Sequence, residues 1–158
     1  MIKQGFSAIV DENTEIVILG SLPSDESIKK HQYYGNPGND FWRLLSRTIG
    51  EDLQGRDYES RLETLKRNRI GLWDVFKFGE REGSEDANIR GEEINQFSML
   101  KEMAPKLRLI CFNGKKAGKY EPLLREMGYK TKILPSSSGA NRRFSKIRES
   151  EWEAVFKR

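Results

Sequence analysis

Residues 15–20, with the sequence EIVILG, are the apolar run from which the fold of this chain can be worked out. An uninterrupted run of large apolar residues that ends at a glycine is typical of a strand buried on both faces. Similar runs follow at residues 70–76 (IGLWDVF), 107–112 (LRLICF) and 131–134 (TKIL). The sequence therefore predicts four strands.

Segments in which apolar residues recur at helical spacing lie between and after these runs. The expected helices cover residues 41–49, 58–65, 94–103, 120–127 and 144–156. Strands that are separated by helices imply a largely parallel sheet with helices on both faces. We therefore predict an α/β fold, a three-layer α/β/α sandwich around a central, mainly parallel four-stranded sheet.

Length and composition limit the class of protein further. A chain of 158 residues suits one domain over residues 1–158. No apolar run approaches the roughly 20 residues that a membrane-spanning helix needs. The single Cys111 excludes an intrachain disulfide, a thiolate-held iron–sulfur cluster and a Cys-rich zinc site. We expect a cytoplasmic protein with no membrane segment, no metal and no cofactor.

The net charge of +4 hides an asymmetry along the chain. Residues 101–158 contain 15 Lys and Arg against 6 Asp and Glu, a net +9, so residues 1–100 carry a net −5. Such a basic segment is either a surface that binds a polyanion or an ordinary solvated face, and the sequence leaves both interpretations open.

Two long polar segments follow predicted strands, where ligands of parallel sheets bind. The first, at residues 21–40, is rich in glycine and proline but lacks both the P-loop motif and GxGxxG, which argues against a nucleotide site. The second includes residues 134–143 (LPSSSGANRR). Serines and a glycine before two arginines suggest a phosphate cradle, or alternatively a helix cap and a flexible turn.

Four motifs taken together resemble the uracil-DNA glycosylase superfamily: residues 20–24 (GSLPS), 34–42 (YGNPGNDFW), 113–117 (NGKKA) and 134–142 (LPSSSGANR). The resemblance extends from about residue 13 to the end of the chain and is closest to the hypoxanthine (deoxyinosine) DNA glycosylase branch. It implies a monofunctional DNA glycosylase of base excision repair that flips a deaminated base into a pocket beyond the sheet, where water replaces the base.

Asn39 matches the asparagine implicated in catalysis in that branch. Departure of the base places positive charge on the sugar and negative charge on the base, so the site needs oriented dipoles. An amide cannot take a proton outright, so we expect Asn39 to hold the attacking water through its side-chain carbonyl. The alternative is that Asn39 or Asp40 caps the helix that begins near Phe41.

The resemblance also implies a base pocket. Mismatch-specific members have an asparagine where this chain has Leu22, which argues against their uracil chemistry. Tyr34 would stack on the flipped base, or else pack in the core; Asn113 would bind the base edge, or else satisfy a turn. The expected substrate-binding residues are Gly20, Ser21, Leu22, Pro23, Ser24, Tyr34 and Asn113.

The serine-rich loop would grip the DNA. Superfamily members often have a leucine wedge where this chain has Ala140, so the wedge is either absent or supplied by Asn141, Arg142 or Arg143. The expected DNA-binding residues are Ser136, Ser137, Ser138, Gly139, Ala140, Asn141, Arg142 and Arg143.

Three further ionisable residues have two interpretations each. His31 is an exposed loop residue or a general base, Asp25 caps a short helix or assists a water, and Asp74 makes a structural hydrogen bond or faces the cleft.

We expect a monomer that acts on damaged DNA. The alternatives are a G:U/T mismatch or uracil-DNA glycosylase, and a catalytically weak module that binds DNA damage.

Overall fold

The computed structural model describes residues 2–80 and 90–156, without the side chains of residues 80, 90–92, 143 and 144. Its main sheet has four parallel strands in the order β3-β2-β6-β7. They are β2 (Ile16–Gly20), β3 (Ile70–Asp74), β6 (Leu109–Asn113) and β7 (Thr131–Leu134). These are the four strands expected from the apolar runs, so the predicted parallel sheet is confirmed.

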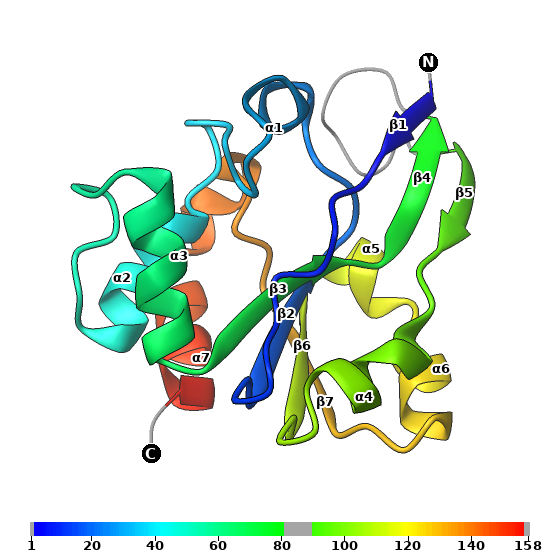
Figure 1. Ribbon diagram of the computed structural model, residues 1–158. Coiled ribbons are helices and arrows are strands. Elements are labelled where there is room, and N and C mark those ends of the chain that lie inside the picture. Colours follow the sequence, from blue (N-terminus) through cyan, green and yellow to red (C-terminus); the bar gives the residue numbers. More distant parts are fainter. Residues whose placement is uncertain (1, 81–89, 157–158) are drawn as a thin grey trace.

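Helices cover both faces of this sheet (Figure 1). One face carries α2 (Phe41–Ile49), α3 (Tyr58–Arg67) and α7 (Ser145–Phe156). The other carries α4 (Leu100–Met103), α5 (Lys115–Gly118) and α6 (Glu121–Glu126). The three-layer α/β/α architecture is therefore confirmed.

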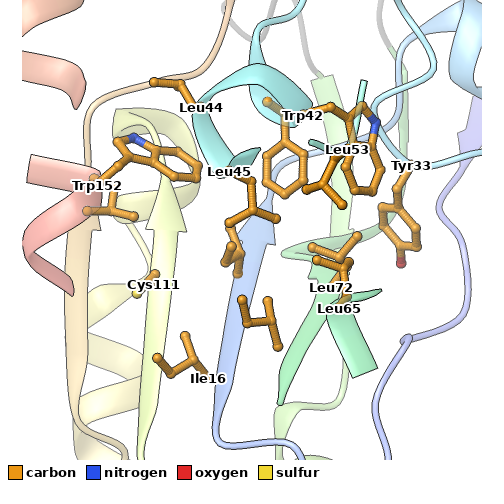
Figure 2. Close-up of a cluster of buried hydrophobic side chains, with 14 residues drawn as sticks. Ile16, Tyr33, Trp42, Leu44, Leu45, Leu53, Leu65, Leu72, Cys111 and Trp152 are labelled. Atoms are coloured by element: carbon orange, nitrogen blue, oxygen red, sulfur yellow. The ribbon is translucent and has the colours of Figure 1, made fainter. Parts of the chain in front are cut away.

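The pleat of β2 divides the core into two clusters, because successive side chains of a strand point to opposite faces. Ile16 and Ile18 pack with the helices α2, α3 and α7, whereas Val17 and Leu19 pack on the other side. Figure 2 shows the first cluster, in which Trp152 approaches from α7. Burial on both faces explains why the run is apolar throughout.

A second, smaller sheet was not predicted. It is antiparallel, in the order β1-β4-β5, with β1 (Ile2–Gln4), β4 (Phe76–Glu80) and β5 (Arg90–Ile94). Only Val75 separates β3 from β4, so the run at residues 70–76 contains one strand and the start of another. These short strands are rich in charged residues, which hides their pattern in the sequence.

The helix expected at residues 94–103 is only partly right. Ile94 ends β5, a 3-10 turn η2 spans Phe97–Met99, and α4 follows. A short helix α1 (Asp25–Lys30) was not among the helices expected from apolar spacing, since it has no apolar stripe. Ser24 is its cap, accepting a hydrogen bond from the backbone N–H of Ser27 at 3.1 Å.

Parallel strands place their carboxyl ends at one edge of the sheet. Gly20, Asp74, Asn113 and Leu134 end the four strands there. The segments that follow β2 and β7 meet above this edge, where the backbone of Asn39 bridges that of Ser138. Within the described part of the chain, no helix is long and apolar enough to cross a membrane.

Candidate active site

A cavity of about 720 Å³ lies at this edge of the sheet. Every residue of the two motifs at 20–24 and 136–140 lines it, together with Tyr34, Asn39, Asn113 and Arg142. Asn141 does not line it, and the side chain of Arg143 lies outside the described residues. The fold thus brings together residues that are more than a hundred positions apart in the sequence.

Asn39 uses its side-chain oxygen within the protein. Oδ1 accepts a hydrogen bond from the backbone N–H of Phe41 at 2.9 Å and another from the hydroxyl of Ser137 at 2.7 Å. The first is an Asx turn at the start of α2, whose N-cap residue is Asp40 and has no side-chain capping bond. Two bonds use both lone pairs of a carbonyl oxygen. This oxygen therefore already has two donors within the protein.

The side chain of Asn113 also makes hydrogen bonds within the protein. Its Nδ2 donates to Ser137 Oγ at 2.8 Å and to the Tyr34 hydroxyl at 3.2 Å. Its Oδ1 accepts from the backbone N–H of Ser137 at 2.9 Å. Both amide hydrogens therefore have acceptors within the protein, and one lone pair of Oδ1 is left for a ligand in this arrangement.

Tyr34 packs against the core with one face of its ring. Its ring centroid lies 3.8 Å from that of Phe41, with an angle of 8° between the planes. Its φ of 53° is in the left-handed region, which a bulky residue seldom adopts. The backbone carbonyl accepts from Nε1 of Trp42 at 3.2 Å. Stacking on Phe41 supports the packing interpretation, while Tyr34 also lines the cavity.

An ion cluster centred on the buried pair Asp40 and Arg148 holds the serine-rich loop, and Arg148 was not among the predicted site residues. Asp40 pairs with Arg148 at 2.8 Å, with Arg142 at 2.9 Å and with Arg43 at 3.3 Å. Arg148 is fully buried, and its Nη1 also donates to the Ser138 carbonyl at 3.1 Å. One signal was available: Arg148 shares a helix face with the apolar Trp152, four residues later.

The pKa of Asp40 is shifted by two opposing influences. Burial, the larger single influence, raises the pKa of this carboxyl, whereas hydrogen bonds from Arg142 and Arg148 lower it, and the net pKa is below the usual value. Asp40 is therefore a structural anion that ties the segment 136–142 to the start of α2. Arg142, which is expected to contact DNA, donates hydrogen bonds from Nε and Nη2 of its guanidinium to Asp40.

The three serines of the loop differ in exposure and partners. Ser137 is fully buried, and its hydroxyl bonds to Asn39 and Asn113. Ser136 Oγ accepts from the Ser138 N–H at 3.1 Å. Ser138 Oγ accepts from the Ala140 N–H at 3.2 Å and caps the 3-10 turn η3 (Gly139–Phe144). Ala140 itself is exposed.

Four further candidate residues have contacts within the protein. Asn141, which does not line the cavity, donates from Nδ2 to the Ser136 carbonyl at 3.1 Å. Asp25 lies in the first turn of α1 and pairs with Lys3 at 2.6 Å. His31 is exposed and its ring lies 5.0 Å from that of Phe6. Asp74 is buried, lines the cavity, and accepts from Asn95 through its backbone carbonyl at 2.8 Å.

Metal ligands do not gather anywhere in the part of the chain that the structure describes. Among those residues, no group of three or more His, Cys, Asp and Glu side chains could hold a metal ion. The cavity is lined by amides, hydroxyls and backbone groups, together with the charged residues Asp74 and Arg142. Such a site can orient a neutral polar molecule and stabilise developing charge with fixed dipoles.

Comparisons with known proteins identify the family and support the fold. A family model described as "Uracil DNA glycosylase superfamily" matches residues 7–157. A curated protein of Methanosarcina acetivorans named "Hypoxanthine DNA glycosylase" is 77% identical over 157 residues, 99% of each chain. One of the same name from Methanosarcina barkeri is 70% identical over the whole of both chains. A solution NMR structure of a Methanosarcina acetivorans protein matches with a TM-score of 0.91 and 78% identity, covering 99% of this chain and 97% of that chain.

Proposed function

The chain belongs to the uracil DNA glycosylase superfamily, and on this premise we propose that it is a monofunctional DNA glycosylase that excises hypoxanthine in base excision repair. One observation carries the proposal: the two relatives named hypoxanthine DNA glycosylase are 77% and 70% identical to it over essentially their full length. The cavity supports it, because its volume of about 720 Å³ is ample for one flipped purine nucleotide.

The reaction exchanges one bond for another at the sugar. The oxygen of water forms a bond to C1′ while the C1′–N9 bond breaks and its electron pair passes to the base. The water gives up a proton to solvent, and the base anion takes one up, so the products are free hypoxanthine and an abasic site. Oriented dipoles around the base and the sugar lower the barrier to this step.

Roles for individual residues follow from this proposal. Asn39 acts in catalysis, Tyr34 and Asn113 border the flipped base, and the motif at residues 20–24 offers its backbone amides, with Leu22 where mismatch-specific members have asparagine. Ser136, Ser138, Ala140 and Arg142 stand at the rim of the cavity toward DNA, where Arg142 is 53% exposed. The partner is damaged DNA. A monomer binds it, since one site flips one base, and the protein acts in the cytoplasm.

The test uses duplexes that contain a single hypoxanthine, uracil, xanthine or thymine opposite defined bases. After incubation, alkali cleaves the abasic sites and the fragments are counted. We expect release of hypoxanthine, and none from matched duplexes without a damaged base. Release of uracil alone would replace the proposal with a uracil glycosylase. Salt-sensitive binding without release of any base would leave a damage-binding module.

A further inference from the structure

The direction of the Asn39 side-chain amide is fixed by its neighbours. The backbone N–H of Phe41 can only donate, so the atom 2.9 Å from it must be the carbonyl oxygen of Asn39 and not the nitrogen. The hydroxyl of Ser137 donates to the same oxygen at 2.7 Å. Rotating the amide by half a turn would set donor against donor at Phe41.

Ser137 is held just as firmly. Its Oγ accepts from Nδ2 of Asn113 at 2.8 Å, which leaves its one hydrogen for Asn39. Its backbone N–H donates to Asn113 and its backbone carbonyl accepts from the N–H of Asp40 at 2.8 Å. Because Ser137 is fully buried, solvent does not compete for these bonds.

The amide nitrogen is the part of Asn39 left for a ligand. Within residues 2–80 and 90–156, no hydrogen-bond acceptor is recorded for Nδ2 of Asn39, and this atom is not sealed from solvent. Asn39 lines the cavity. The side chain therefore presents two N–H donors to whatever enters, while both lone pairs of its oxygen are used.

We propose that Asn39 acts on the substrate as a hydrogen-bond donor to the departing base, and that Ser137 is the positioning residue that keeps it in this direction. The inference rests on the proposed glycosylase function. As the C1′–N9 electron pair enters the purine, negative charge spreads to its ring nitrogens and carbonyl oxygen. A fixed N–H stabilises that charge without reorganising. The attacking water is then oriented by other groups than the Asn39 carbonyl.

An Asn39→Asp variant separates a donor from an acceptor, with Asn39→Ala as the reference. One carboxylate oxygen still accepts from Phe41 and Ser137, and the second faces the cavity. When ionised, this oxygen cannot donate and repels the base anion. We expect excision by Asn39→Asp at neutral pH to be no faster than by Asn39→Ala, both about 100-fold or more below the unaltered chain.

The pH dependence of the excision rates distinguishes a donor from an acceptor at position 39. As the pH falls toward the pKa of an unperturbed Asp, about 4, the acid becomes neutral and can donate. Its proton must sit on the cavity-facing oxygen, because the other oxygen faces two donors. The rate ratio of Asn39→Asp to Asn39→Ala should therefore rise with acidity. The other ionisable groups around position 39 are present in both variants: Asp40 with Arg43, Arg142 and Arg148, and Asp74, Tyr33 and Tyr34 at the cavity.

The result that overturns the donor assignment is equally distinct. If Asn39→Asp keeps the activity of the unaltered chain, or its ratio to Asn39→Ala rises with pH, the side chain acts as an acceptor for the water. Failure of the proposed function itself would appear in the unaltered chain, which would release no hypoxanthine, and would remove this inference with it.

Ser137→Ala tests the positioning role. We expect kcat to fall about 10-fold or more with little change in KM, because orientation is lost and binding is kept. In the Asn39→Ala background the same substitution should cost nothing further in single-turnover excision, since Ser137 acts through Asn39. An equal loss in both backgrounds would show that Ser137 does not act through Asn39, because it also holds Asn113, and would refute its positioning role for Asn39.

Discussion

Nη2 of Arg148 lies 2.8 Å from Oδ2 of Asp40, although the two residues are 108 positions apart and both are buried. Asp40 precedes α2 and Arg148 belongs to α7, so the pair joins the two helices beside the cavity. Arg148 also donates to the carbonyls of Ser136 and Ser138. The pair therefore fixes the backbone of the serine-rich loop through these two carbonyls.

Removing the anion should destabilise the fold because Arg148 would stay buried without its counter-charge. We expect Asp40→Asn to lower the free energy of unfolding by about 3 kcal/mol. Arg142→Ala should cost much less, because the Arg142 side chain is 53% exposed and water replaces its partner. Urea unfolding followed by tryptophan fluorescence measures both. Equal small losses for the two variants would show that Arg148 finds other acceptors.

The same pair should make the free energy of unfolding depend on pH in the acid range. The folded pKa of Asp40 lies below its unfolded value, because the hydrogen bonds from Arg142 and Arg148 outweigh the effect of burial. A carboxyl of this kind contributes stability above its unfolded pKa of about 3.9, and that contribution is lost as the pH falls through the folded pKa. The gap in unfolding free energy between the unaltered chain and Asp40→Asn should therefore be constant near neutrality and shrink in acid. A gap that stays constant as the pH is lowered from neutrality to well below about 3.9 would contradict this assignment.

The sequence predicted the main sheet because burial on both faces leaves strands such as β2 apolar throughout. It did not predict β4 and β5, where charged residues alternate irregularly and pairing shifts register. The short helix α1 has a cap at Ser24, acidic residues in its first turn and basic residues in its last, which is a usable signal without any apolar stripe.

The candidate site was predicted as a set of residues but not as a set of bonds. Motifs place Asn39, Asn113 and Ser137 at one edge of the sheet, yet a sequence does not say which amide atoms already have partners. Arg148 was counted among the basic surface, because an arginine that is buried by pairing with a distant aspartate has no local pattern. Long-range pairing of this kind is set by the tertiary fold.

Cys111 offers a probe of global unfolding. It is fully buried in the middle of β6, and burial raises the pKa of its thiol to about 12. The thiolate is the reactive form, so the folded protein should resist alkylation at neutral pH. We expect the labelling rate to rise with urea in step with loss of tryptophan fluorescence. Fast labelling of the native protein would reveal a local opening of β6 that leaves the rest folded.

The close approach of the two loops can be tested at Gly139. A Cβ built there would clash with the backbone carbonyl oxygen of Gly38, so the loops must separate to admit it. Because the backbone of Asn39 bridges that of Ser138, separation would displace Asn39 from its position in the cavity. Gly139→Ala should therefore reduce single-turnover excision by about 100-fold.

Gly55→Ala is the matched control for this substitution. Its new methyl group meets only the carboxylate of the exposed Asp52, which can turn away. We expect this variant to keep the excision rate of the unaltered chain, measured on the same hypoxanthine duplex. Because Gly139→Ala acts on the placement of Asn39, combining it with Asn39→Ala should cost little more than Asn39→Ala alone. Full activity in Gly139→Ala would show that the loops move apart without cost and that their contact does not set the geometry of Asn39.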